Sequence, residues 1–182
     1  SPVTYYFENL KEDDALASGI ASSTYNCISW TGGITSYWEW PCYPGSAYYI
    51  PGEENSLSCF DLFYSSERFP GCKTYTRSGA TASNSAVDLW GFINNGIYEY
   101  THGSISNNSD KNHHGYDWES KPGSLTRTFH PRNALSGTSY GKVLRYYRIS
   151  NSQTGNSSLE SAVANNIAMI DNIKLTSSQE AF

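Results

Sequence analysis

The sequence predicts a single α+β domain in which helices come first and antiparallel strands follow. Helical patterns lie in the first third of the chain, near Cys27 and over residues 56–66. Strand patterns follow over residues 86–150, where Asn94-Asn95-Gly96 separates two apolar runs in the way that a hairpin turn does. A run of helices followed by a run of strands is typical of an α+β domain.

Three parts of the chain are expected from the order of these patterns. Residues 1–23 form an N-terminal arm with a short helical piece around Leu10–Ala17, and residues 24–150 form the α+β domain. Residues 151–182 carry a C-terminal helix that packs on the same domain. That helix has the clearest pattern, because its apolar residues recur every three or four positions: Leu159, Val163, Ile167, Ile170 and Ile173.

A helix is predicted to begin near Cys27. Asn26 is a good N-cap residue, which places Cys27 in the first turn of that helix. A thiol at this position is a nucleophile when the helix dipole and a nearby imidazolium lower its pKa. The alternative is a packing cysteine, since Cys is among the most buried residue types. The pattern leaves both interpretations open.

The strands of the domain are predicted from period-2 patterns and their bounding turns. They cover residues 86–93, 97–106, 116–121 and 141–150. The stretch Arg127–Ala134 is expected to form a short helical turn after Pro131, and residues 38–55 an aromatic-rich loop.

Composition excludes several classes of protein. Charged residues make up 16% of the chain and hydrophobic residues 38%, so a packed core is expected. The net charge is −5 without a Lys/Arg cluster, which disfavours a nucleic-acid partner. No apolar run approaches the roughly 20 residues of a membrane span. Abundant Ser, Asn, Gly and Tyr favour an exported protein, periplasmic or secreted, although Ser1-Pro2-Val3 shows no signal peptide.

The four cysteines allow three complete pairings. Their spacings of 15, 17 and 13 residues contain no CxxC, which makes a structural zinc site improbable. If Cys27 is a free nucleophile, at most one bridge forms among Cys42, Cys59 and Cys72. Cys59 with Cys72 is the preferred pair, because it would close a short loop, and four free cytosolic thiols agree equally with the sequence.

Five motifs in this order resemble an uncharacterised bacterial family. They are Tyr25-Asn26-Cys27-Ile28-Ser29-Trp30, Trp38-x-Trp40-Pro41, Thr101-His102-Gly103, Trp118-Glu119-Ser120-Lys121-x-Gly123 and Tyr140-Gly141-Lys142-Val143. That family looks like a divergent relative of the NlpC/P60 and papain-like cysteine hydrolases. The resemblance covers about residues 24–149.

The resemblance implies a papain-like, NlpC/P60-like fold, in which a helix with the nucleophile packs on an antiparallel sheet. Cys27 is then the nucleophile and His102 the base, with Glu119 or Ser120 on the next strand orienting the imidazole. The usual third-position His of NlpC/P60 proteins is missing from Tyr116–Lys121, so the resemblance is incomplete there.

Other residues are expected to support or line such a site. Asn26 adds an amide to the oxyanion site or caps the helix, and capping is the preferred interpretation. The residues expected to wall the cleft are Trp30, Trp38, Trp40 and His130. His130 is also a rival to His102 as the base. No cofactor and no metal is expected.

The function expected from these features is amide hydrolysis through a thioacyl intermediate on Cys27. The substrate would be a peptide, a cell-wall peptide or an acylated small molecule. Two alternatives remain: a non-catalytic domain that binds a glycan or a protein through the aromatic loop, and an inactive member of the fold.

Overall fold

The computed structural model describes residues 2–54, 56–66, 73–106 and 116–150. The chain divides into two compact units, residues 1–150 and 151–182. The helix expected over residues 157–173 and the cysteine at position 72 lie outside the described residues. The first unit is an α+β structure with short helices and one seven-stranded antiparallel sheet, which confirms the predicted class.

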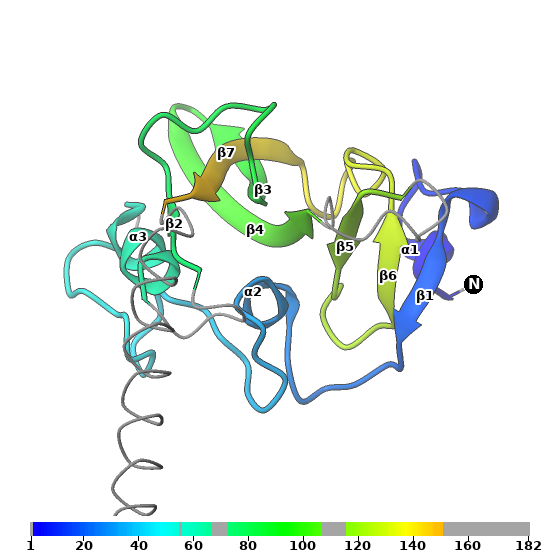
Figure 1. Cartoon of the computed structure of the whole chain (residues 1–182), viewed down its shortest axis with the longest axis horizontal. Helices are drawn as coiled ribbons and strands as arrows, with labels where there is room; N and C mark the ends of the chain where they lie inside the picture. Colours follow the sequence, from blue (N-terminus) through cyan, green and yellow to red (C-terminus); the bar gives the residue numbers. More distant parts are fainter. Residues whose placement is uncertain (1, 55, 67–72, 107–115, 151–182) are drawn as a thin grey trace, which may run out of the picture. The chain divides into compact units, whose positions relative to one another are not determined.

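The sheet is not arranged in chain order. Its strands are β1 (Leu16–Gly19), β2 (Tyr75–Thr76), β3 (Val87–Asn94), β4 (Ile97–Ser106), β5 (Trp118–Ser120), β6 (Arg127–His130) and β7 (Lys142–Ile149). They lie side by side in the order β1-β6-β5-β4-β3-β7-β2 (Figure 1). Strand β4 therefore lies at the centre, between the long hairpin partner β3 and the short strand β5.

The helices of the described residues are short. They are α1 (Pro2–Tyr6), α2 (Cys27–Thr31), α3 (Ser58–Tyr64) and a single 3-10 turn, η1 (Glu12–Asp14). Helix α2 packs against β4 and β5, and α3 packs against β2 (Figure 1). The helix predicted to begin at Cys27 and the one predicted over residues 56–66 are thus confirmed.

The hairpin between β3 and β4 forms where the sequence predicts it. Asn95 and Gly96 both have positive φ, at 49° and 77°. A two-residue turn of this kind matches the twist of the flanking strands, and Asn-Gly adopts it at low cost.

Two local predictions were correct only in part. Residues Arg127–His130 form strand β6, and the expected turn follows Pro131, whose carbonyl oxygen accepts the Ala134 N–H at 3.1 Å. In the arm of residues 1–23, the expected helical piece is the single turn η1, and β1 follows it. Strand β6 pairs with both neighbours, as Phe129 lies opposite Glu119 on β5 and Leu16 on β1. Backbone hydrogen bonds to strands on both sides favour a strand at residues whose own sequence pattern for one is weak. Tertiary structure therefore overrides local preference here.

A β-bulge in β4 precedes His102 directly. Trp90 of β3 pairs with His102, but the next residue, Gly91, pairs with Tyr100, so Thr101 is the extra residue. Bulges change the direction of the side chains beside them. The bulge requires Gly91, because a Cβ there would lie 2.0 Å from the carbonyl oxygen of Glu99.

The core has two parts. One packs α2 and α3 against β3 and β7, through residues such as Ile28, Phe60 and Tyr147. The other gathers Val3, Phe7 and Leu10 of the N-terminal arm around Trp90. The arm is therefore packed against the sheet and is part of the folded unit.

Candidate active site

Cys27 is the first residue of α2, and Asn26 caps that helix. The Asn26 side-chain oxygen accepts the backbone N–H of Ser29 at 2.9 Å, and its amide nitrogen donates to the backbone oxygen of Glu39 at 2.9 Å. Both ends of the amide are therefore used in fixing the start of α2. The structure places Asn26 as a cap, the preferred of the two sequence interpretations.

The Cys27 thiol is buried, with 5% of the residue exposed. Burial raises the pKa of this thiol to about 11, while the backbone N–H groups of Gly103 and Ile28 and the charge of Lys121 act to lower that pKa. Pairing between β4 and β5 includes Ile105 and Ser106 but does not extend to Gly103. The Gly103 N–H is thus left free by β5 and is directed at the thiol.

His102 belongs to a chain of three side chains across β4, β5 and β6. Its Nε2 lies 2.9 Å from Oγ of Ser120, and the same oxygen lies 2.8 Å from Nε2 of His130. All three residues are fully buried. Burial lowers the pKa of His130 to about 4, and burial together with His130 lowers the pKa of His102 well below its ordinary value.

The hydrogen bonds of this chain determine which nitrogen of His102 carries a proton. Nδ1 of His130 lies 2.6 Å from the carbonyl oxygen of Pro131, which only accepts, so this Nδ1 donates. Nε2 of neutral His130 then accepts the Ser120 hydroxyl proton, and the Ser120 oxygen in turn accepts the Nε2–H of His102. His102 is left with a bare Nδ1.

That Nδ1 is buried and has no hydrogen-bond partner among the described residues. An unpaired buried acceptor costs about 1 to 3 kcal/mol, so such groups are rare unless they have a use. Within the same residues, no hydrogen bond joins Nδ1 to the Cys27 thiol. Gly103, which follows His102, faces α2, so His102 points to the opposite face of β4, and the thiol lies where β4 and β5 separate.

Tyr140 covers His102 and was not singled out as a site residue by the sequence. The two rings are stacked, with centroids 4.1 Å apart and planes inclined by 7°. Thr101, the bulge residue, donates its hydroxyl to the Tyr140 carbonyl at 2.7 Å, and Phe7 of the arm packs on the Tyr140 ring at 5.0 Å. The Tyr140-Gly141-Lys142-Val143 motif is the signal in the sequence that could have identified this residue.

Lys121 is a second residue that sequence reasoning missed. Its side chain is buried, and Nζ donates to the backbone oxygens of Ser22, at 2.7 Å, and Gly123. Burial lowers the pKa of Lys121, and the nearby Cys27 acts to raise it. A fixed positive charge near the thiol favours the thiolate.

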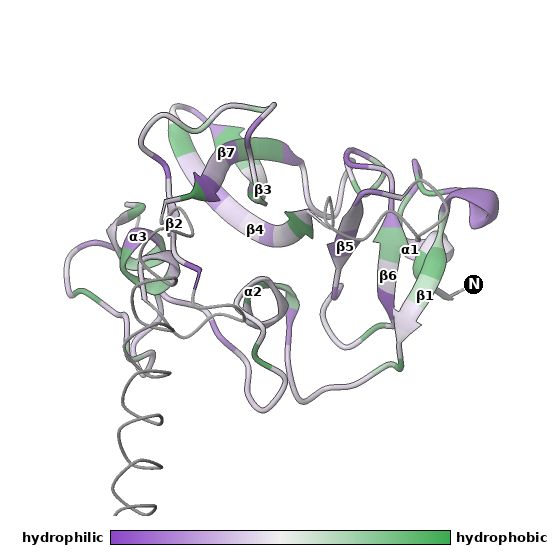
Figure 2. Cartoon of the chain, in the orientation of Figure 1, coloured by the Kyte–Doolittle hydropathy of each residue, from purple (hydrophilic) through white to green (hydrophobic). Residues whose placement is uncertain are grey.

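Glu119 and Trp30 form a separate cluster. The Trp30 indole donates to the Glu119 carboxylate at 2.6 Å, and Arg127 lies 3.7 Å from that carboxylate and 3.8 Å from the centre of the Trp30 ring. Ser120, and not Glu119, therefore contacts His102. Strand alternation explains the difference, since neighbouring residues of β5 face opposite sides of the sheet. Figure 2 shows β5 in hydrophilic colours, although all three of its residues are buried.

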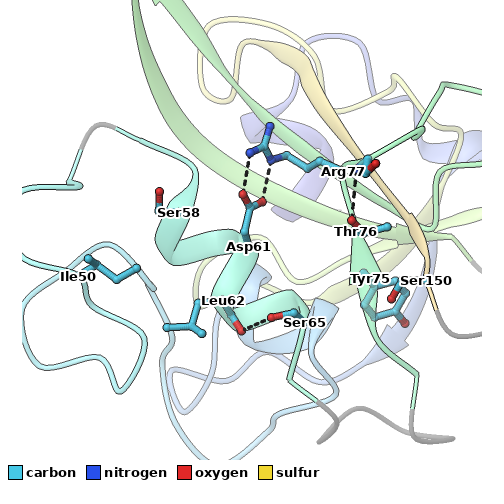
Figure 3. Close-up of a pocket in the computed structure, with 10 residues that line it drawn as sticks. Ile50, Ser58, Asp61, Leu62, Ser65, Tyr75, Thr76, Arg77 and Ser150 are labelled. Atoms are coloured by element: carbon cyan, nitrogen blue, oxygen red, sulfur yellow. Dashed lines mark hydrogen bonds and ion pairs between the residues drawn. The ribbon is translucent and has the colours of Figure 1, made fainter.

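Trp38 and Trp40 line a pocket of about 450 Å³ next to Asn26. Trp38 is 52% exposed, whereas Trp40 is half-buried and packs edge-on against Phe60. A larger pocket of about 870 Å³ lies elsewhere, between α3 and β2 (Figure 3). Its charged residues, Asp61 and Arg77, already pair with each other through two hydrogen bonds. Each charge is therefore already balanced, and a charged ligand would gain little there.

A family model matches residues 16–148, which is most of the chain. Its description is a domain of unknown function, DUF7689. The chain belongs to the DUF7689 family. No curated protein and no solved structure matches the chain.

The DUF7689 match contains every member of the candidate site. Cys27, His102, Ser120, His130 and Tyr140 all lie between its first and last matched residues. The match begins at the first residue of β1, so α1 and Phe7, which packs on Tyr140, lie before it.

Three further observations concern the described part of the DUF7689 chain. Within it, no three His, Cys, Asp or Glu residues come together as a metal site would require. None of its helices has the length and apolar character needed to cross a bilayer. Cys42 and Cys59 are free thiols, buried in the same core cluster.

Proposed function

We propose that this protein is a cysteine hydrolase that cleaves an amide bond with Cys27 as nucleophile and His102 as base. The observation that carries the proposal is the bare, buried Nδ1 of His102 on β4. The next residue of that strand, Gly103, directs its backbone N–H at the Cys27 thiol. The fold would be papain-like, close to NlpC/P60 proteins, since the thiol opens a helix and the third residue, Ser120, lies on the strand after that of the histidine.

The proposed reaction starts from a neutral pair. The thiol proton passes to Nδ1 of His102 while sulfur attacks the substrate carbonyl carbon, and the backbone N–H of Cys27 stabilises the oxyanion. The imidazolium then gives its proton to the leaving amine, and a thioester remains on Cys27. Water, deprotonated by His102, attacks the thioester, which releases the acid and restores the thiol.

Ser120 and His130 are proposed to hold His102 in the productive tautomer. The Ser120 oxygen accepts the Nε2–H, and that hydrogen bond strengthens when His102 gains a positive charge. The neutral resting pair follows from burial, which raises the pKa of Cys27 and lowers that of His102. Proton transfer therefore accompanies attack on the substrate, and needs Nδ1 and the thiol to approach each other during the reaction.

The test is the rate of Cys27 alkylation by iodoacetamide as a function of pH, with the modified cysteine identified by peptide mass mapping. In the native chain His102 assists the reaction, so the rate should stay level from about pH 7 to pH 9. General-base assistance is worth about a hundredfold or more, so His102→Ala should lower the rate by that order and make it rise with pH. Equal alkylation rates in the native chain and in His102→Ala would show that His102 is not the base for Cys27.

The substrate class remains the one that the sequence suggested: a peptide, a cell-wall peptide or an acylated small molecule, met by an exported bacterial protein. A binding domain without catalysis is the second candidate. Exposed rings in the aromatic loop, with Trp38 52% and Tyr43 63% exposed, favour it. That candidate predicts ligand binding unaffected by Cys27→Ala together with equal alkylation rates in the test above.

A further inference from the structure

The pocket of about 450 Å³ combines aromatic rings with one buried carboxylate. The residues of its wall include Asn26, Tyr37, Trp38, Glu39, Trp40 and Tyr43. All of them except Asn26 lie within residues 37–43, at the start of the aromatic loop, and Asn26 directly precedes Cys27. The pocket therefore lies beside the start of the helix that carries the proposed nucleophile.

Glu39 is held rigidly against that helix by its backbone. Its N–H donates to Oγ of Ser29 at 2.8 Å, and its carbonyl oxygen accepts the Asn26 amide at 2.9 Å. Both partners belong to the start of α2. A carboxylate on so fixed a backbone gives a ligand group a defined position relative to Cys27.

Among the described residues, no cation offsets the charge of the Glu39 carboxylate. The residue is 4% exposed, and the donor that reaches its side chain from the described residues is the Ser46 hydroxyl, at 2.7 Å. None of those residues forms an ion pair with it. The sequence itself contains no Lys or Arg between Lys11 and Arg68. Buried carboxylates are normally paired, because an unpaired buried charge is costly.

The aromatic rings of the same pocket supply a second feature that attracts a cation. Tyr37, Trp38 and Tyr43 are 43%, 52% and 63% exposed. The face of an aromatic ring attracts an ammonium group, most strongly for Trp. A pocket wall that combines aromatic rings with a buried carboxylate fits an alkylammonium group better than a neutral sugar or an apolar side chain, which would leave the charge unpaired.

We infer that this pocket binds an alkylammonium group, such as a lysine side chain, with Glu39 pairing the charge and the aromatic rings enclosing the methylene chain. If the pocket selects substrates for hydrolysis, the inference rests on the proposed function, because the bound group would then belong to the substrate cleaved at Cys27. If the pocket only binds its ligand, the inference does not depend on catalysis.

The experiment is a calorimetric titration of the full chain with Nα-acetyl-lysine N-methylamide and with its norleucine counterpart, which lacks only the ammonium group. The lysine compound should bind saturably, and the norleucine compound about tenfold more weakly or worse. Glu39→Gln should reduce lysine binding by the same order without affecting norleucine binding. Equal binding of the two compounds, or no saturable binding of either, would overturn the inference.

A second variant guards against misfolding of Glu39→Gln. Tyr43→Ala removes an exposed ring and should weaken lysine binding several-fold, whereas Tyr5→Ala, at a tyrosine that is 84% exposed outside the pocket, should not. A neutral oligosaccharide of N-acetylglucosamine is the competing probe. If it binds in this pocket with an affinity that Glu39→Gln leaves unchanged, the ligand is a glycan and the inference is wrong.

The Cys27→Ala protein separates this inference from the proposed function. Lysine binding should persist in it, because the thiol lies outside the pocket wall. If the native chain binds the lysine compound selectively but its Cys27 is unreactive, the pocket inference is supported and the proposed hydrolase function is wrong. If the reactivity of Cys27 depends on His102 but the pocket shows no preference for the lysine compound, the hydrolase is supported and the pocket inference is wrong.

Discussion

Tyr140 lies flat against His102, with 4.1 Å between ring centroids and 7° between ring planes. The bulge residue Thr101 holds the Tyr140 backbone, and Phe7 of the arm holds its ring. The Tyr140 ring therefore covers one face of the imidazole, and the Ser120 hydroxyl contacts its edge at Nε2. This confinement accounts for the low pKa of His102 through exclusion of water.

Replacing Tyr140 should affect His102 through ring packing. Tyr140→Ala removes the stacked ring, so water reaches the imidazole, its pKa rises towards the ordinary value, and the level region of the Cys27 alkylation profile should begin at a higher pH. The lost packing should cost about 3 kcal/mol of unfolding free energy. Tyr140→Phe keeps the ring and should leave the profile unchanged; a shift in Tyr140→Phe equal to that in Tyr140→Ala would contradict a packing role.

Ser120→Ala should slow Cys27 alkylation at neutral pH by about tenfold, because His102 loses the acceptor for its Nε2–H. Ser106→Ala is the matched control. Ser106 ends the neighbouring strand, and its hydroxyl is buried without a partner among the described residues. That variant should react like the native protein, and similar losses in both would point to a general packing effect.

His130→Phe should act on Cys27 through Ser120. Without an acceptor at position 130, the Ser120 hydroxyl donates to Nε2 of His102, and the proton of His102 moves to Nδ1, where it blocks transfer from the thiol. Alkylation should slow by about the same factor as in Ser120→Ala. The double variant should be no slower than either single variant, because both act on one chain of hydrogen bonds. Additive losses would show that His130 has an independent role.

Acid should destabilise the fold through the buried histidines. The folded-state pKa of His130 is lowered from 6.5 to about 4, so below pH 6.5 the unfolded chain binds a proton that the folded chain refuses. Stability therefore falls as the pH drops from 6.5 towards 4, by about 3 kcal/mol for this one residue. Urea unfolding of the native chain and of His130→Gln at several pH values checks this, since the variant should show a shallower fall over that window.

Much of the fold follows from local sequence patterns. Asn95-Gly96 predicts the β3–β4 hairpin because few other dipeptides adopt its turn at low cost, and Asn26 predicts the start of α2 through its capping oxygen. Strands β1 and β6 escaped prediction since their short sequences become strands only by pairing with each other and with β5. Local pattern carries no information on such distant partners.

The candidate site was predicted in outline only. Cys27 and His102 stood out through their motifs, but the choice between Glu119 and Ser120 depended on which face of β5 each residue occupies. The role of His130 depends on a hydrogen bond through Ser120, and that of Tyr140 on the bulge at Thr101. Both are consequences of three-dimensional register, which a single sequence does not reveal.

The short ladder between β4 and β5 gives the sheet a seam. In the described part of the chain, two residue pairs, at Ile105 and Ser106, join the half that contains β3, β7 and β2 to the half that contains β6 and β1. With so few pairs between β4 and β5, the sheet can open locally at the seam while each half stays intact. The Cys27 thiol lies where the pairing of these two strands stops. Substrate access would then be a hinge motion of the two halves. Amide hydrogens at the seam should exchange with solvent sooner than those of the β3–β4 hairpin, and mild denaturant should expose Cys27 before the fold is lost.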